Sequence, residues 1–260
     1  MLRYRFLFEQ MVRRELRQKY KGSALGVLWY LLNPLALMAA YGLMFGVLLK
    51  VPGTRTEDYL LFLFVGLIVW LFFSQSLLSA SGSLLEQSSL VARVRFPRET
   101  VPASVVVVQL VTFLVLLVLV LPVALIVRDS LSPALLLLPV VVACLFALAL
   151  GLALVAAIGH AYFRDVQPIL AAAMVPWFFL TPIFYEPSKL PGIAKHPWAE
   201  TLLTWVNPVA PFIQAVRDIV YDGRLPSAGV MAYVLVAGVL GLAAGQLLFR
   251  RAEGELAVVL

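Results

Sequence analysis

Six apolar runs without any Asp, Glu, Lys or Arg take up most of the 260-residue chain. An apolar helix of about 20 residues spans the roughly 30 Å hydrocarbon layer of a membrane, where a central charge costs about 2.5–3.5 kcal/mol. Continuous apolar runs favour helices over the strands of a barrel, which alternate apolar and polar residues. The sequence therefore predicts an all-α integral membrane protein with six transmembrane helices in a single domain, residues 1–260. The six runs cover residues 29–49, 59–79, 101–127, 133–158, 168–185 and 229–249.

The basic residues are concentrated in alternate connecting segments. Segments 1–28, 80–100, 159–167 and 250–260 together hold 13 basic and seven acidic residues, whereas the other connections hold seven of each. Cytoplasmic segments carry the Lys/Arg excess in membrane proteins, so we expect a multi-pass protein with both termini in the cytoplasm. This topology accounts for the net charge of +6. We therefore expect membrane lipid, and no nucleic acid, to contact the chain.

The predicted spans divide the chain into an ordered series of segments. Within residues 186–228, Asn207-Pro208 separates two apolar-rich segments that are each too short to span a membrane. We expect them to form short re-entrant or interfacial helices on the outer face, before the last span. The expected order is a cytoplasmic or interfacial helix in 1–27, spans one to five in 28–185, extracytoplasmic short helices in 186–228, span six in 229–249 and a cytoplasmic tail in 250–260.

The N-terminal segment 4–20 has the pattern of an amphipathic helix. Apolar residues recur at helical spacing, and Arg13, Arg14 and Arg17 gather on the other side. Such a helix lies in the headgroup layer with its basic face toward anionic lipid. It either anchors the chain on the cytoplasmic side or frames a lateral opening in the membrane.

The connection after the second span predicts a short cytoplasmic helix. The sequence SLLE at 83–86 is a capping-box pattern, and the helix would end before Pro97. It carries apolar residues beside Arg93 and Arg95. A short exposed helix of this kind suits docking to a soluble partner, although the same pattern fits an ordinary structured loop.

Polar and aromatic residues inside the spans are candidates for a transport path. Asn33-Pro34 predicts a kink, because Pro removes a backbone donor; the kink is either simply tolerated or part of a gate. Aromatic residues cluster in the first, second and fifth spans. Rings near span ends often form an interfacial belt, but ring faces also offer weak contacts along which a sugar polymer can slide.

The sequence lacks the motifs of an enzyme or of an ion-driven pump. It contains no GxxxxGK[ST] phosphate loop, no HExxH and no Cys/His metal spacing. The spans hold no carboxylate or Lys that could carry protons or Na⁺, and an adjacent pair such as Arg164-Asp165 is usually solvated. We therefore expect no catalytic residue, metal or cofactor in this chain, and any energy for transport must enter from elsewhere.

Several short motifs, in the same order along nearly the whole chain, resemble the permease subunits of bacterial polysaccharide-export ABC transporters. These are type-2 ABC permeases that export lipid-linked O-antigen or wall teichoic acid. Each motif is weak by itself, and together they are specific. They are KYKGSALGVLW at 19–29, LNPL at 32–35, VRFPRE at 94–99, YFRDV at 162–166, WFFLTPIFY at 177–185, NP at 207–208 and GRLP at 223–226.

The resemblance implies a permease without enzymatic activity, which moves a lipid-linked glycan across the bacterial cytoplasmic (inner) membrane. Two copies would pair as a homodimer and dock two ATP-binding cassette subunits, which hold the ATP and Mg²⁺. The segment 84–95 would be the main coupling helix, with the loop 160–167 as a second contact. The first and fifth spans would border the path. A type-2 permease for another cargo, such as a drug or lipid, and a polytopic enzyme or membrane scaffold remain alternatives.

These implications assign two sets of residues. The residues expected to couple to the ATPase are Leu85, Glu86, Leu90, Arg93, Val94, Arg95, Arg164 and Asp165. Those expected at the translocation path or its gate are Trp29, Tyr30, Asn33, Pro34, Tyr41, Phe45, Trp70, Phe73, Trp177, Phe178, Phe184 and Tyr185.

Overall fold

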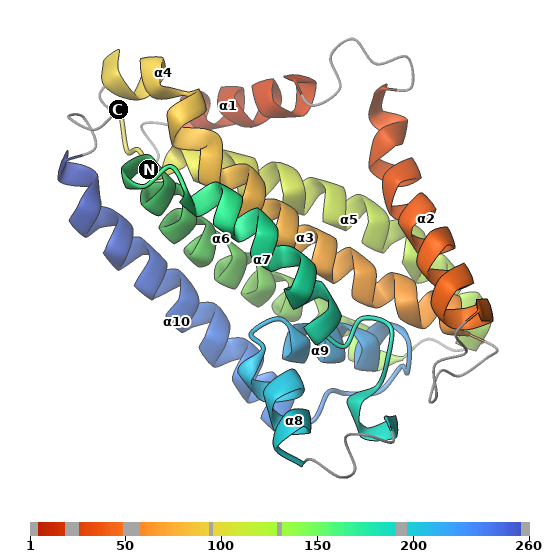
Figure 1. Cartoon of the computed structure of the whole chain (residues 1–260). Helices are drawn as coiled ribbons and strands as arrows, with labels where there is room; N and C mark the ends of the chain where they lie inside the picture. The colour runs from red at the N-terminus through yellow and green to blue at the C-terminus, as the bar shows by residue number, and fades with distance from the viewer. Residues whose placement is uncertain are drawn as a thin grey trace.

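The computed structural model describes residues 5–18, 26–48, 58–93, 96–128, 132–190 and 197–255, and these parts form a bundle of helices joined by turns (Figure 1). The amphipathic helix α1 and four long apolar helices are where the sequence predicts them. The helices are α1 (Arg5–Gln18), α2 (Trp29–Tyr41), α3 (Tyr59–Glu86), α4 (Ser88–Arg93), α5 (Thr100–Arg128), α6 (Leu138–Tyr162), α7 (Val166–Leu180), α8 (Pro197–Thr201), α9 (Ala210–Val220) and α10 (Ala228–Ala252). Short 3₁₀ or π segments extend several of them: Gly26–Leu28 and Gly42–Leu48 around α2, Pro133–Leu137 before α6, and Leu202–Val206 after α8.

In the described part of the chain, four helical stretches are long and apolar enough to cross a membrane: Tyr59–Glu86, Thr100–Arg128, Pro133–Tyr162 and Ala228–Ala252. The first and fifth predicted spans correspond to the shorter apolar helices Leu32–Leu48 and Val166–Leu180. The helix of the fifth predicted span ends at Leu180, before the predicted span end at residue 185, because Thr181 is extended (φ −92°, ψ 133°). The residue before a proline is biased toward this conformation, and Pro182 follows.

The predicted helix start at residues 83–86 is wrong. The helix α3 continues through this segment to Glu86. The buried hydroxyl of Ser83 donates to the carbonyl oxygen of Ala80 (2.7 Å) within α3, so it does not cap a new helix. The break falls instead at Gln87, and the short helix α4 begins at Ser88.

The helix α3 lies at the centre of the bundle. It contacts α2, α5, α6, α7 and α9, and most of its apolar length is buried. The helices α6 and α10 pack on each other along their lengths, and Gly151, Gly241 and Gly245 allow this. A Cβ atom on Gly151 or Gly245 would overlap the backbone of the facing helix. Small residues permit such close helix contact in membrane proteins.

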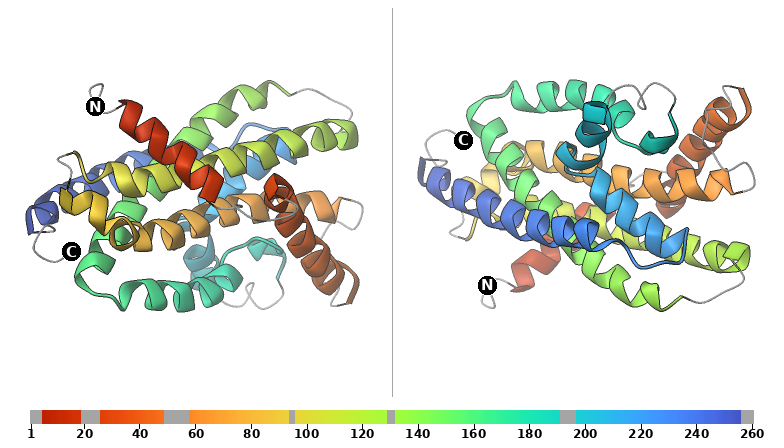
Figure 2. Two further views of the ribbon diagram at one scale, coloured as in Figure 1. Left: turned by 90° about the horizontal axis from the view of Figure 1, so that it is seen from above. Right: turned by 90° about the horizontal axis from the view of Figure 1, so that it is seen from below.

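The two ends of the bundle are made of different segments, and the one built on α1 and α4 is the α1 end (Figures 1 and 2). Here Gln87 Nε2 donates to Glu15 Oε1 (2.9 Å), Arg98 Nη1 donates to the Glu253 carbonyl (2.7 Å), and the Tyr162 hydroxyl donates to the Ala252 carbonyl (2.7 Å). A buried apolar cluster lies beneath these contacts. It comprises Met11, Leu84, Val101, Leu154, Ala157, Ile158, Ala161 and Phe249. The described parts of the predicted cytoplasmic segments therefore meet at one end.

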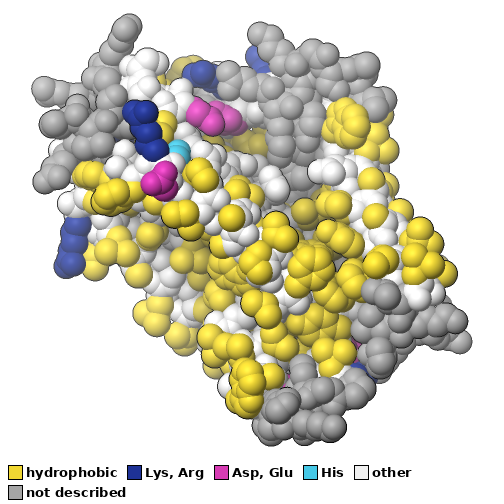
Figure 3. All heavy atoms as spheres, viewed as in Figure 1, with side chains coloured by type: hydrophobic (Ala, Val, Ile, Leu, Met, Phe, Trp, Pro, Cys, Tyr) yellow, Lys and Arg dark blue, Asp and Glu magenta, His cyan; other side chains and the backbone are white. Residues whose placement is uncertain are grey.

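The opposite end, the α9 end, brings together described parts of the segments that the sequence places on the outer face of the membrane. The short helices α8 and α9 lie there (Figure 1). Arg128, at the end of α5, donates from Nη1 to the Ile219 carbonyl of α9 (3.1 Å). The helix α9 is almost completely buried against the bundle. Between the two ends, the face seen in Figure 3 presents mainly hydrophobic side chains.

Candidate translocation site

Eight of the predicted path residues form one connected group of rings, here called the aromatic cluster. The cluster joins α2, α3, α7 and the segment 181–185. Tyr41 stacks on Phe178 (5.1 Å between ring centroids), and Phe45 stacks on Phe184 (4.1 Å). Trp70 meets Trp177 edge-on (6.1 Å). The members are Tyr41, Phe45, Trp70, Phe73, Trp177, Phe178, Phe184 and Tyr185.

The rings differ in how far they are accessible. Trp70, Phe73 and Phe178 are buried, while Tyr41 at the end of α2 and Phe45 in the π segment that follows are half-buried. An open cavity of about 300 Å³ lies between α2, α3 and α7, and Tyr41, Trp70 and Phe178 are among its walls. The cluster thus packs α2 and α7 against the same region of α3 and leaves a ring-lined hollow between them.

The Asn33-Pro34 pair of α2 lines a second, smaller cavity of about 110 Å³ between α2, α3 and α5. Trp29, Asn33 and Pro34 contribute one wall, and Gln75 of α3 lies between this cavity and the ring-lined one, bordering both. Gln109 of α5 lines the small cavity as well. An uncharged side-chain amide inside an apolar helix is costly unless it meets a polar partner or water. The two cavities form a surface along α3 that combines rings with uncharged polar groups.

The glutamines were missed by the prediction, although the sequence contained a signal for them. Gln75 and Gln109 lie within two of the charge-free runs. Gln109 Nε2 donates to the hydroxyl of Ser79 (3.3 Å). A search of the spans for amides, and not only for charges and rings, would have selected these residues. Of the remaining predicted path residues, Tyr30 lies on α2, and its side chain is outside the described part.

Asn207 connects the aromatic cluster to the short outer helices. Trp177 Nε1 donates to Asn207 Oδ1 (3.2 Å), which also accepts the backbone N–H of Val209 (3.1 Å). Asn207 Nδ2 donates to the Thr181 hydroxyl (2.8 Å). All these groups lie within or beside buried structure, so the bonds replace contacts to water. A displacement of α9 would therefore move the ring of Trp177 through the hydrogen bonds of Asn207.

Arg217 of α9 is the second connection at this end, and its role was not predicted. Its side chain is buried, and it donates to the carbonyl oxygens of Phe62 (3.3 Å), Pro182 (2.6 Å) and Ile183. The guanidinium carbon lies 3.6 Å from the centroid of the Phe62 ring. Gly66 makes room for it, since a Cβ atom there would lie 2.5 Å from Arg217 Nη2. In the sequence, Arg217 is one of eight charged residues in the connection 186–228, and no pattern there marks it as buried.

Burial lowers the pKa of Arg217 to about 9, and the nearby carboxylate of Glu186 opposes this shift. Arg217 therefore remains protonated at neutral pH. Its charge is held by carbonyl dipoles and a ring face, which is a favourable arrangement for a guanidinium. The group ties α9 to α3 and to the segment that follows α7.

The predicted coupling residues that the structure describes lie at the α1 end. Leu85 and Glu86 form the last turn of α3, and Leu90 of α4 packs against the apolar cluster beneath α1. Arg164 and Asp165 are exposed in the turn between α6 and α7. Val94 and Arg95 lie outside the described residues, as does the side chain of Arg93.

The end of α3 lies beside the start of α7. A Cβ atom on Gly82 would be 3.2 Å from both Glu86 Oε1 and Gln167 Nε2. The described parts of the two predicted partner contacts, 84–93 and 160–167, therefore lie side by side. Within the described residues, no group of three or more His, Cys, Asp or Glu side chains could hold a metal ion there or elsewhere.

Comparison with known proteins identifies the family. Residues 7–221 match the family described as ABC-2 type transporter. The chain is 34% identical to an O-antigen export system permease protein RfbA of Myxococcus xanthus, over 96% of this chain and 94% of the relative. It is 25% identical to a protein of the same name from Klebsiella pneumoniae, over 98% of this chain and 96% of the relative. The chain thus belongs to the ABC-2 type transporter family.

Proposed function

We propose that this chain is the transmembrane subunit of an ATP-driven exporter that moves lipid-linked polysaccharide across the bacterial cytoplasmic membrane. The observation that carries the proposal is the similarity to O-antigen export permeases along nearly the full length of both chains. The uncharged, ring-rich surface beside α3 agrees with a sugar polymer as cargo, since it offers many weak contacts and no ion site.

In this proposal the chain crosses the membrane six times, with the α1 end in the cytoplasm. The helix α2 with its flanking segments is the first span, and α7 is the fifth. The 15 residues of α7 extend about 22 Å at 1.5 Å per residue. Residues 181–185 complete the crossing to roughly 30 Å. The excess of basic residues at the α1 end supports this orientation.

Mechanical coupling in this proposal runs through α3. Two ATP-binding subunits, which hold ATP and Mg²⁺, dock on the α1 ends of two copies of this chain. Their motion reaches Glu86 and α4, and α3 carries it to Trp70 and Phe73 in the aromatic cluster. Beyond the cluster, α3 is tied to α9 through Phe62 and Arg217. One rigid helix therefore links the docking surface, the rings and the outer helices.

Docking can be tested by co-expressing the tagged chain with a candidate ATP-binding cassette subunit from the same genome and purifying the pair. Arg164→Glu reverses an exposed charge at the α1 end and should reduce the amount of ATPase recovered at least fivefold. Lys189→Glu is the control, because it changes a charge at the α9 end and should leave recovery unchanged. Equal recovery with both variants would argue against docking at this surface.

Cargo can be tested separately in cells that lack the chromosomal copy of the gene. The wild-type chain should restore polysaccharide on the cell surface, while cells without it accumulate the lipid-linked polymer inside. Restored drug resistance or altered lipid composition, with surface polysaccharide unchanged, would instead favour a type-2 permease for another cargo.

A further inference from the structure

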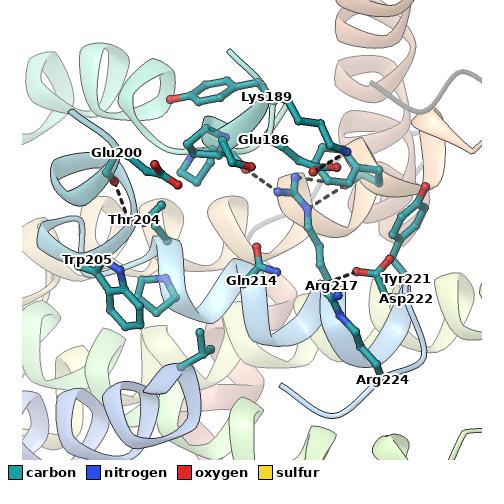
Figure 4. Close-up of a pocket in the computed structure, with 18 residues that line it drawn as sticks. Glu186, Lys189, Glu200, Thr204, Trp205, Gln214, Arg217, Tyr221, Asp222 and Arg224 are labelled. Atoms are coloured by element: carbon teal, nitrogen blue, oxygen red, sulfur yellow. Dashed lines mark hydrogen bonds and ion pairs between the residues drawn. The ribbon is translucent and has the colours of Figure 1, made fainter. Parts of the chain in front are cut away.

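A polar cavity of about 440 Å³ lies at the α9 end and is separate from the two cavities beside α3 (Figure 4). Most of its lining comes from three elements: the short helix α8 with the following segment, the face of α9, and the loop 182–190. Its size is within the roughly 300–1,000 Å³ range of small-ligand pockets. Figure 4 shows Glu200, Thr204 and Trp205 on one side of it and Gln214 and Arg217 toward the other.

The charges around the cavity balance one another. Among the residues that line it, Lys189 pairs with Glu186 (2.6 Å), and Arg224 approaches Asp222 (3.3 Å). The guanidinium of Arg217 is occupied by backbone carbonyl groups, as described above. These pairs leave little net field to hold a free ion, since both signs are present close together. The cavity is therefore better matched to a neutral, polar ligand than to a metal cation or a free anion.

Three groups that line the cavity have hydrogen-bonding capacity or ring surface to spare. The carboxylate of Glu200 makes no ion pair within the described residues. The Thr204 hydroxyl donates to the Glu200 backbone carbonyl (2.6 Å), so its oxygen can still accept a hydrogen bond. The indole of Trp205 is 44% exposed and meets the ring of Tyr233 (6.0 Å). A carboxylate, a hydroxyl and a half-open indole together suit a ligand with several hydroxyl groups and an apolar C–H face.

The cavity also adjoins the aromatic cluster. Tyr185 lines the cavity, and its ring packs edge-on against Phe184 (5.0 Å between centroids). A polymer that follows the rings would therefore meet this cavity as it leaves the bundle on the α9 side. Tyr185 thus belongs both to the candidate path and to the candidate binding site.

We propose that this outer cavity is a saccharide-binding site that receives sugar units of the exported polymer after they pass the aromatic cluster. The inference rests on the proposed function, because that function supplies the class of ligand. Glu200 accepts hydrogen bonds from sugar hydroxyls, and the face of Trp205 contacts a sugar ring. Bound sugar would hold the polymer at the exit and oppose its backward movement.

Binding can be measured on the purified complex of the chain with its ATPase in lipid nanodiscs. The probe is a set of oligosaccharides released by mild acid from the surface polysaccharide of the host cell. We expect saturable binding that Glu200→Gln and Trp205→Ala each weaken at least tenfold, or about 1.4 kcal/mol. Trp198→Ala is the matched control, because Trp198 is an exposed indole on α8 that does not line the cavity. The affinity of this variant for the oligosaccharides should stay within twofold of wild type.

The outcomes separate this inference from the proposed function. Glu200→Gln is close in shape to the native residue, and recovery of the ATPase with each variant checks that the fold is intact. An absence of saturable binding, or equal affinity in all three variants, would overturn the saccharide site even if polysaccharide export by the wild type is normal. Binding of Ca²⁺ or inorganic phosphate that displaces the oligosaccharide through Glu200 would also overturn it. Loss of ATPase recovery in the wild type would instead contradict the proposed function.

Discussion

Replacement of Arg217 by Met tests whether the buried guanidinium holds the α9 end together. Methionine keeps much of the apolar stem but removes every donor. The carbonyl oxygens of Pro182 and Ile183 then lose the side-chain partner described above, in a segment that is buried. A buried acceptor without a partner costs about 1–3 kcal/mol, so two cost about 2–6 kcal/mol.

Part of this cost is recovered, because the variant no longer buries a charge. Burial is the main reason that the pKa of Arg217 falls to about 9. Desolvation of a buried charge costs several kcal/mol, which its hydrogen bonds offset in the native chain. We therefore expect a net loss of about 2–4 kcal/mol, which for a chain of this size corresponds to a fall in Tm of about 4–16 °C.

The assay is thermal unfolding of the detergent-solubilised chain, followed by size-exclusion chromatography with fluorescence detection. Arg13→Met is the control, because Arg13 forms an exposed pair with Glu9 in α1 and such pairs contribute about 0–1 kcal/mol. Limited proteolysis should detect earlier cleavage in 181–190 in the Arg217 variant. A Tm within 2 °C of wild type, with unchanged proteolysis, would refute the role of Arg217 as the connection between α3, α9 and the segment after α7.

Two further predictions concern packing and pH. Gly151→Val should reduce the yield of folded protein severely, because its Cβ would overlap the backbone of Gly241. Gly229→Ala is the control, since its Cβ would meet Trp205 at an ordinary 3.5 Å. Equal yields of the two variants would contradict the close helix contact. Burial, and then the charge of Glu86, raise the pKa of Glu15 above its ordinary value. The stabilising contribution of the protonated carboxyl is therefore complete below pH 4.5 and is lost as pH rises through the folded-state pKa. Glu15→Gln should raise the stability at pH 8 by up to about 1 kcal/mol and flatten the decline of Tm between pH 4.5 and pH 8; an unchanged pH profile would contradict the assignment.

The long helices could be predicted from the sequence because the membrane imposes a simple rule on charge. Absence of charge over about 20 residues is enough to locate a span, and α3, α5, α6 and α10 follow from it. The ends of spans are less constrained, since the apolar run at residues 59–79 stops before α3 does. The helix continues to Glu86 because its last turns pack under α1, which is a tertiary effect.

The candidate site was predicted only in part, for a related reason. The sequence identifies rings and places them in spans, but their grouping depends on how α2, α3 and α7 pack. Arg217 and Asn207 were not assigned because hydrogen-bonding partners distant in the chain decide their roles. Arg217 meets Phe62, which is 155 positions away. Sequence patterns report the period of an element well, whereas contacts between elements require the folded chain.

The tight fit of α6 on α10 has a consequence for how such a subunit could change shape. Their glycine backbones are in direct contact, so these two helices would move together as one rigid unit. The helix α2, by contrast, packs mainly on α3 and stands at the edge of the bundle (Figure 2). A rearrangement that widens the ring-lined hollow would therefore move α2 outward while α6 and α10 stay in place.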